Sequence, residues 1–264
     1  VNVAVVLLRH ISNFTDFAAL ERDARVNLFY TSNVEDVKKA DIIILPGTKA
    51  TLDDLYELRR NGVASAIIEA HRNGKQIVGI CGGYQMLGEA IADPHHVESE
   101  HGAVKGLGYL PMKTTFAETK HTRQVTADCP GMEFFGCTLL GRGLKGYEIH
   151  MGETEFSAPV RHPFYIHGAK GEPSRWDGAL REDGLVFGTY IHGLFDDDAF
   201  RHQLINTLRI HKGLRPLAIQ RNRRQAKERA YEHLADVVER ALDMEKLKAI
   251  MAEMAEERRE EERV

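Results

Sequence analysis

The chain has 264 residues, 43% of them hydrophobic and 28% charged, and its formal net charge at pH 7 is −4. This composition is typical of a folded globular protein, and the small negative charge argues against a nucleic-acid groove, which needs clustered lysines and arginines. No run of about 18 apolar residues occurs, so the sequence predicts no membrane-spanning helix. Three cysteines cannot form a disulfide framework, so we expect a reducing, cytoplasmic environment; they are Cys81, Cys129 and Cys137.

The sequence up to Glu89 alternates between buried strands and helices. Residues 3–8 and 41–45 are continuous apolar runs rich in valine and isoleucine, the pattern of strands that are covered on both faces in a parallel sheet. Asn-Gly pairs at 61–62 and 73–74 end two helical segments. The pattern predicts an α/β fold. Its further strands are expected at 26–30 and just before Cys81, and its helices at 34–39, 52–60 and 63–73.

After Glu89 the pattern changes to short strand-like pieces with many glycines and prolines, typical of antiparallel or mixed strands with long loops. A helix is expected at 196–208, and nearly all of the chain from Pro216 onward is helix-forming. We therefore predict a main domain over residues 1–212, with an antiparallel or mixed extension, and a helical C-terminal extension over 213–264.

Cys81 is the first candidate for chemistry. It follows an apolar strand and has Gly79 and Gly83 two residues away on either side. This is the pattern of a nucleophile elbow, a sharp strand-to-helix turn that exposes a strained nucleophile. N–H groups at the start of the following helix favour a thiolate, and the Gly82 N–H can bind an oxyanion. The alternative is a buried structural cysteine on a turn, which does not require glycine at both positions.

A thiol that attacks an amide needs a base to take its proton and later to protonate the leaving amine, and histidine suits both roles. Among 13 histidines, His192 follows the predicted strand 185–191, where a buried strand leaves the sheet. A histidine that caps the next helix would occupy the same position, and spacing does not separate the two interpretations. Glu148 and His150 share one face of a predicted strand; they could orient a base or form a cross-strand surface pair.

Two other kinds of site are not predicted. His95, His96 and His101 lie in a polar loop, and their spacing matches neither a helical pair of ligands nor a zinc finger. We therefore expect no metal site. No Gly-x-x-x-x-Gly-Lys-Ser/Thr motif occurs, so the chain carries no evident ATP site.

Two motifs together resemble the class I, or triad-type, glutamine amidotransferase domain: Gly79-Ile80-Cys81-Gly82-Gly83-Tyr84-Gln85 and Thr189-Tyr190-Ile191-His192-Gly193. Further stretches narrow the resemblance to the glutaminase half of the cobyric acid synthase family. They are residues 12–17, 45–49, 93–94, 97–99, 106–108 and 146–152. The resemblance implies a flavodoxin-like, open, mostly parallel sheet with helices on both faces.

The resemblance also implies the chemistry. Cys81 is the nucleophile that forms a γ-glutamyl thioester, and His192 is the general base and then the general acid. Backbone N–H groups near Gly47 and Gly82 form the oxyanion hole.

Leu194 departs from the pattern of typical class I domains, which carry glutamate two residues after the histidine. Either a dyad suffices, or another carboxylate orients the imidazole, for which Glu148 is the candidate. Arg123 could clamp the carboxylate of glutamine, although a surface arginine fits the sequence equally well. Tyr84 and Gln85, just after the elbow, are the other candidates for substrate binding.

Members of this family, as the resemblance implies, hydrolyse L-glutamine and pass ammonia to an N-terminal, ATP-dependent synthetase domain. That domain amidates peripheral carboxylates of a corrinoid in cobalamin biosynthesis. We expect it, with its ATP and Mg²⁺, to be missing from this chain, which begins directly on a strand, and we expect no cofactor here. Two alternatives stay open: the glutaminase subunit of a Mur-ligase-like complex that amidates lipid II, and a non-catalytic docking or regulatory module with a decayed triad.

Overall fold

The computed structural model describes residues 1–168, 171–218 and 223–261, which divide into two compact units, Val1–Gln220 and Arg221–Val264. The segment after the last helix of the first unit is hydrogen-bonded to that helix. The Asn206 side chain accepts from the Leu217 N–H at 3.1 Å and donates to the Leu217 carbonyl at 3.0 Å.

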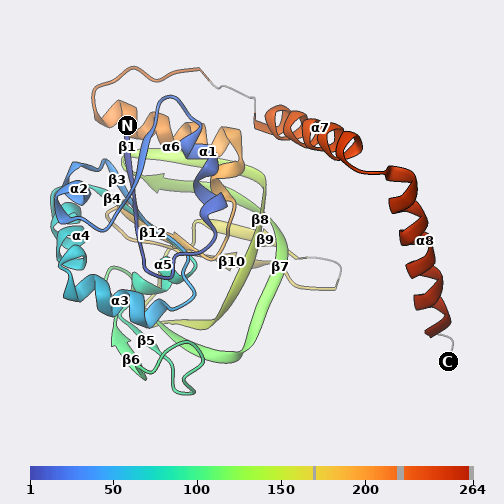
Figure 1. Ribbon diagram of the computed structural model, residues 1–264. Helices are drawn as coiled ribbons and strands as arrows, with labels where there is room; N and C mark the ends of the chain where they lie inside the picture. Colours follow the sequence, from blue (N-terminus) through green and yellow to red (C-terminus); the bar gives the residue numbers. More distant parts are fainter. Residues whose placement is uncertain (169–170, 219–222, 262–264) are drawn as a thin grey trace. The chain divides into compact units, whose positions relative to one another are not determined.

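A six-stranded sheet forms the centre of the first unit (Figure 1). All neighbouring strands are parallel except the edge strand β11, which is antiparallel to β12. The parallel strands, numbered in chain order, lie in the order 2-1-3-4-5, which is the flavodoxin-like arrangement. The predicted fold class is therefore confirmed. In spatial order the strands are β11 (Ala179–Leu180), β12 (Val186–Thr189), β4 (Gln76–Ile80), β3 (Ile42–Leu45), β1 (Asn2–Val6) and β2 (Asn27–Thr31).

Both faces of this sheet are buried, because alternate side chains of a strand point to opposite faces. Val3 and Val5 belong to one core, and Ala4 and Val6 belong to the other. This is why the apolar runs in the sequence are continuous rather than alternating. The first core is covered by η1 (Phe14–Phe17), α1 (Ala18–Glu21) and α6 (Asp198–His211), and the second by α2 (Val34–Lys39), α3 (Thr51–Arg60), α4 (Val63–Arg72) and α5 (Gly82–Met86).

The second half of the unit forms a mixed sheet around two long strands, β7 (Met112–Phe134) and β8 (Cys137–Phe156), which curve beside the first sheet (Figure 1). They pair antiparallel with three shifts of register. The sequence predicted short separate strands here, because each irregularity interrupts the alternation of polar and apolar residues. Tyr147 of β8 also pairs with His192, just after β12. The other strands of this region are β5 (Ala90–Ala92), β6 (Ala103–Lys105), β9 (Phe164–His167) and β10 (Arg175–Asp177).

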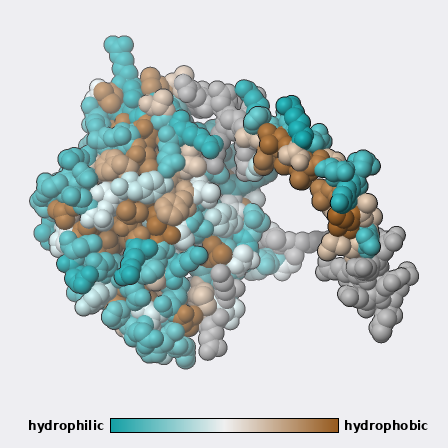
Figure 2. Space-filling model, viewed as in Figure 1, coloured by the Kyte–Doolittle hydropathy of each residue, from teal (hydrophilic) through white to brown (hydrophobic). Residues whose placement is uncertain are grey.

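The second unit contains the helices α7 (Arg223–Ala241) and α8 (Met244–Glu261). Leu234 and Val238 are exposed on α7, one helical turn apart. Hydrophobic residues form a band along this helix (Figure 2). Among the described residues, no helix has the length and apolar character needed to cross a membrane.

Candidate active site

Cys81 lies where β4 ends and the short helix α5 begins. Its backbone has φ 53° and ψ −110°, a conformation that residues other than glycine rarely adopt. Two hydrogen bonds hold it there: the Cys81 N–H donates to the Thr189 carbonyl at 2.9 Å, and the Gln85 N–H donates to the Cys81 carbonyl at 3.0 Å. Such strain costs about 1–3 kcal/mol and persists only where the surrounding structure imposes it. The backbone therefore has the geometry of a nucleophile elbow.

The glycines that flank Cys81 are required by close packing. A Cβ at Gly83 would lie 2.0 Å from the Leu45 carbonyl oxygen, and a Cβ at Gly79 would lie 2.7 Å from the backbone of α5. Glycine at both positions lets this helix lie against β3 and β4. Because α5 has only five residues, its help in binding an anion is confined to the N–H groups of its first turn, including that of Gly82.

His192 is fully buried beside the elbow. Its Nδ1 lies 2.7 Å from one carboxylate oxygen of Asp16, and the other oxygen accepts from the Gly193 N–H at 2.9 Å. The Cys81 thiol lies near enough to the imidazole to influence its charge. Since Nδ1 faces Asp16, the nitrogen left for the thiol is Nε2. The Tyr147 ring stacks on the imidazole, with the ring centroids 4.9 Å apart and the planes at 13°. Thiol, imidazole and carboxylate thus lie together at one site.

These contacts change the protonation of His192. Burial by itself lowers the pKa of an imidazole, but the hydrogen bond with Asp16, the neighbouring Cys81 thiol and the negative charge of both groups raise the pKa of His192 to about 10. This rise favours the imidazolium form of the ring at neutral pH. It can stabilise a thiolate and can donate a proton to a leaving amine.

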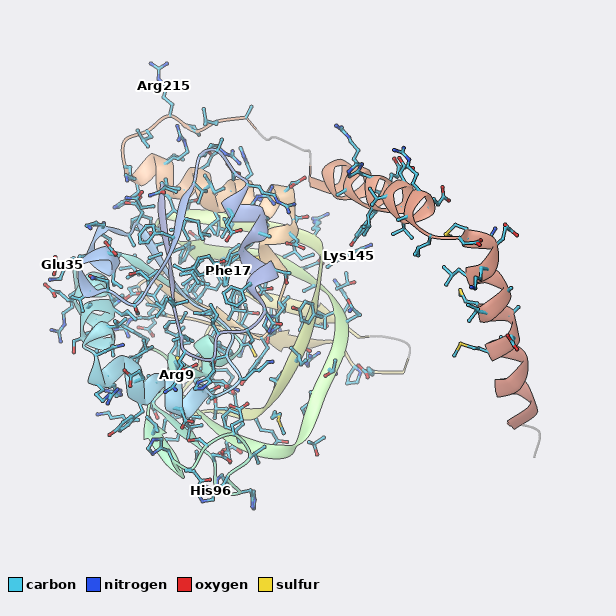
Figure 3. The ribbon with its side chains drawn as sticks, viewed as in Figure 1. Arg9, Phe17, Glu35, His96, Lys145 and Arg215 are labelled. Atoms are coloured by element: carbon cyan, nitrogen blue, oxygen red, sulfur yellow. The ribbon has the colours of Figure 1, made fainter. Side chains whose placement is uncertain are left out.

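Asp16 is the acid that the sequence analysis missed. It lies in η1, directly after β1 and its loop, and is 2% exposed. The next residue, Phe17, points into the interior of the unit and anchors this turn in the core (Figure 3). Asp16 and His192 are 176 positions apart, so no local spacing could have paired them. The available signal was a polar residue after a buried parallel strand, at the sheet edge where α/β proteins form sites.

Glu148, the acid suggested by the sequence, does not lie beside His192. Successive residues of a strand face opposite sides, and on β8 Tyr147 takes the side of the imidazole. Glu148 points to the other side, where its carboxylate is bonded to Arg175 and lies 3.5 Å from Nε of Arg123. The acid that contacts the imidazole therefore comes from η1 and not from β8.

A pocket of about 400 Å³ opens over Cys81. The side chain of Gln85 forms one wall, held by hydrogen bonds to the hydroxyls of Thr51 at 3.4 Å and Tyr190 at 3.3 Å. The backbone of β8 forms another wall, where the Ile149 carbonyl lies 3.3 Å from the Cys81 sulfur. Gln85, one of the predicted substrate-binding residues, is therefore part of this pocket.

Two side chains of opposite charge, Lys49 and Glu98, also line the pocket. The Glu98 carboxylate accepts a hydrogen bond from the Thr51 N–H at 3.2 Å. Burial raises the pKa of Glu98 to about 7, and the negative charges of Asp93 and Asp53 add to this rise. Glu98 is thus an acid whose charged form would gain from a cation inside the pocket.

Tyr84 and Arg123, also predicted to bind the substrate, line a different pocket of about 290 Å³. Tyr84 is 1% exposed and packs edge-on against Tyr190, with ring centroids 5.1 Å apart. The guanidinium of Arg123 lies 3.2 Å from Glu172 and close to Glu148. The structure therefore does not bring these two side chains together with the nucleophile.

Gly47 and Gly82, the candidates for the oxyanion hole, both lie at the nucleophile. A Cβ at Gly47 would lie 3.2 Å from Cε1 of His192. A Cβ at Gly82 would lie 2.8 Å from the Thr48 side chain and 3.3 Å from the Thr48 nitrogen. The bend after β3 therefore packs against both the imidazole and the elbow. Its N–H groups and that of Gly82 are candidates to stabilise an oxyanion.

Comparison with known proteins gives a consistent result. Residues 2–200 match the family described as the CobB/CobQ-like glutamine amidotransferase domain. The chain is 45% identical over 257 residues to the cobyric acid synthase of Citrobacter koseri, covering 97% of this chain and 50% of that protein. It is 46% identical over 256 residues to the cobyric acid synthase of Phocaeicola vulgatus, covering 96% of this chain and 48% of that protein. The chain thus spans about half the length of the curated relatives it matches.

Among solved structures, the chain is similar to PurLQS from Thermotoga maritima. The TM-score is 0.53 at 20% sequence identity, over 72% of this chain and 86% of that one, which supports a shared fold. The family match confirms the resemblance of the motifs around Cys81 and His192, and with it the predicted enzyme class, glutamine amidotransferase. The chain belongs to the CobB/CobQ-like glutamine amidotransferase domain family.

Proposed function

We propose that this chain is the glutaminase part of a cobyric acid synthase, which hydrolyses glutamine and supplies ammonia for the ATP-dependent amidation of corrinoid carboxylates in cobalamin biosynthesis. The observation that carries the proposal is the grouping of Cys81, His192 and Asp16 at a strained elbow, under a pocket of about 400 Å³. The relatives named cobyric acid synthase support the choice of pathway.

In the first step, the Cys81 thiolate attacks the side-chain amide carbon of glutamine, and the oxyanion that forms is stabilised by backbone N–H groups. His192, kept protonated by Asp16, donates its proton to the amide nitrogen, which leaves as ammonia. A γ-glutamyl thioester remains on Cys81. The imidazole, now neutral, takes a proton from a water molecule that attacks the thioester. Glutamate is released and the thiolate is restored.

The charges that line the pocket suit the amino-acid end of glutamine. The carboxylate of Glu98 pairs with the α-ammonium group, and the ammonium group of Lys49 pairs with the α-carboxylate. Without substrate, the pKa of Glu98 is about 7. A bound ammonium group favours the ionised form of this side chain. Lys49 thereby takes the role first suggested for Arg123, which lies in the other pocket.

The remaining half of the relatives' length is where we place the ATP-dependent synthetase. The chain itself has no Gly-x-x-x-x-Gly-Lys-Ser/Thr motif. ATP, Mg²⁺ and the corrinoid are therefore assigned to that other region, and ammonia is the product that passes between the two.

Two alternative functions are less well supported. A glutaminase that partners a Mur-ligase-like synthetase would use the same elbow, but the relatives cited above are named cobyric acid synthase and favour a corrinoid over lipid II. A docking module with a decayed triad is disfavoured by Asp16, which provides the carboxylate that Leu194 does not.

Glutamine hydrolysis by the purified chain tests the proposal. We expect glutamate release from L-glutamine by the wild-type chain and a loss of at least about 10³-fold in Cys81→Ala, because the covalent route is removed. Cys137→Ala, which changes a cysteine outside the pocket, is the matched control and should retain activity. A Cys81→Ala variant as active as the wild type would refute the proposal. With the synthetase half added, amidation of lipid II but not of a corrinoid would refute the assigned pathway.

A further inference from the structure

Asp54 is a buried acid that lies next to the catalytic loops without lining the pocket. It belongs to the first turn of α3 and is 2% exposed. The pocket over Cys81 is lined by Thr48, Lys49 and Thr51 from this part of the chain, and not by Asp54. The reaction steps described above do not use it. Its contacts indicate a supporting role.

The carboxylate of Asp54 joins two separate loops. It accepts a hydrogen bond from the Thr48 hydroxyl, in the loop after β3. The His10 N–H lies 3.3 Å from each of its oxygens, and Nδ1 of His10 lies 3.0 Å from Oδ1. His10 belongs to the loop after β1. One buried side chain therefore contacts both of the loops that follow two adjacent strands of the central sheet.

The two loops together form the wall beside the imidazole. They are also linked directly by two backbone hydrogen bonds, from the Ser12 N–H to the Gly47 carbonyl at 2.9 Å and from the Lys49 N–H to the His10 carbonyl at 3.1 Å. Gly47 lies against His192 and Gly82 lies against the Thr48 nitrogen, so closely that a Cβ on these glycines would be 3.2 Å and 3.3 Å from them. A displacement of these loops by about 1 Å would move the oxyanion-binding N–H groups away from the nucleophile, and errors of that size can cost about 10²-fold in rate.

We propose that Asp54 is a positioning residue for glutamine hydrolysis. It fixes the loops after β1 and β3, so that the N–H groups of the Gly47-Thr48 bend face the carbonyl oxygen of a substrate held at Cys81. This inference rests on the proposed glutaminase function. Because the oxyanion contact is strongest in the transition state, loss of Asp54 lowers kcat much more than it raises KM.

The neighbouring Asp53 provides a contrast. Its carboxylate accepts a hydrogen bond from the Ser99 hydroxyl, and Ser99 directly follows Glu98, the acid assigned to the α-ammonium group. Asp53 therefore supports the wall that binds the substrate, whereas Asp54 supports the wall that stabilises the oxyanion. Loss of the Asp53 side chain is expected to raise KM and to leave kcat nearly unchanged, which is the opposite pattern.

The test compares Asp54→Asn, Asp53→Ala and the surface control Glu57→Gln on the same helix. Two rates are measured in each: steady-state glutamine hydrolysis, and alkylation of Cys81 by iodoacetamide, which forms no oxyanion. For Asp54→Asn we expect kcat to fall about 10- to 100-fold, with KM and the alkylation rate within about threefold of wild type. Asp53→Ala should raise KM, and Glu57→Gln should behave as wild type.

A second pair of variants covers the case in which Asp54→Asn does not fold. Thr48→Val removes the hydroxyl that binds both Asp54 and the His10 carbonyl and should lower kcat in the same way, whereas Thr48→Ser keeps the hydroxyl and should restore most of it. A kcat within about threefold of wild type in Thr48→Val or in folded Asp54→Asn would overturn the inference, and so would a parallel fall of kcat and alkylation. A wild-type chain that neither hydrolyses glutamine nor reacts with a glutamine-like diazoketone would instead contradict the proposed function.

Discussion

Replacing Asp16 by asparagine tests the contact that orients the imidazole. Asp16 accepts two hydrogen bonds, from Nδ1 of His192 at 2.7 Å and from the Gly193 N–H at 2.9 Å. Asparagine offers one oxygen and one NH₂ group, so an oxygen that stays with Gly193 turns the NH₂ group toward Nδ1. The imidazole then carries its proton on Nε2, the nitrogen that faces the thiol, and can no longer accept a proton there.

The size of the effect follows from the first of these bonds. The hydrogen bond from Nδ1 to a charged carboxylate is worth about 1.5–3 kcal/mol. Its loss corresponds to a rate factor of about 10–160. The pKa of His192 should also fall, because one of the charges that raise it is removed. We therefore expect kcat/KM to drop about 10²-fold. The decrease of kcat/KM on the alkaline side of the pH profile, its alkaline limb, should also occur at a lower pH than in the wild type.

Initial rates of glutamate release, measured across the neutral and alkaline range, provide the assay. Asp36→Asn is the matched control, because this carboxylate lies on α2 and pairs with Lys39 at 2.7 Å, away from the site. The control should keep both the rate and the pH profile. An Asp16→Asn variant with kcat/KM within about threefold of wild type and an unshifted alkaline limb would refute the reasoning.

Three further predictions concern the pocket and the elbow. Glu98→Gln should raise KM for glutamine about tenfold with little change in kcat, because it removes a charged partner of the α-ammonium group. In the wild type, KM should rise as the pH falls through about 7, where Glu98 becomes protonated. Steady-state kinetics of Glu98→Gln should not show this rise. Gly83→Ala should lower the free energy of unfolding by about 2 kcal/mol in urea titrations, because its Cβ would lie 2.0 Å from the Leu45 carbonyl oxygen; an unchanged midpoint would contradict the packing argument. Arg123→Ala should leave KM within about twofold of the wild-type value, since Arg123 lies in the other pocket. A large rise in KM would indicate that Arg123, and not Lys49, binds the α-carboxylate of glutamine.

The elbow could be predicted from sequence because its determinants are local. Gly79 and Gly83 are required by the approach of one short helix to two strands, and both lie within two residues of Cys81. The apolar runs of β1 and β3 were equally informative, since a strand buried on both faces has no polar alternation to obscure it. These features depend on residues that are close together in the chain, so the sequence shows them directly.

The third catalytic group could not be predicted in the same way. Asp16 meets His192 because β1 and β12 both end at the same edge of the sheet, and only the strand order brings them there. Glu148 was a reasonable candidate from its motif. The pairing of Tyr147 with His192, which no local pattern encodes, decides that Glu148 faces the opposite side of β8.

The substrate-binding side chains were missed for a related reason. Glu98 lies in a polar loop whose histidines were considered for metal binding, and Lys49 lies in the bend whose Gly47 was considered for the oxyanion hole; neither side chain was assigned to the substrate. Both turn into one pocket because their loops pack around the first turn of α3, where the Thr51 N–H binds Glu98. Loop residues acquire such roles from tertiary contacts, and composition alone does not show them.

The most direct test of the central claim is to find where the chain reacts with a glutamine-like diazoketone, by mass spectrometry of its peptides. The account predicts a single adduct on Cys81 that excess glutamine prevents and that Asp16→Asn slows. Equal labelling of Cys129 or Cys137, or labelling of Cys81 that glutamine does not affect, would contradict it.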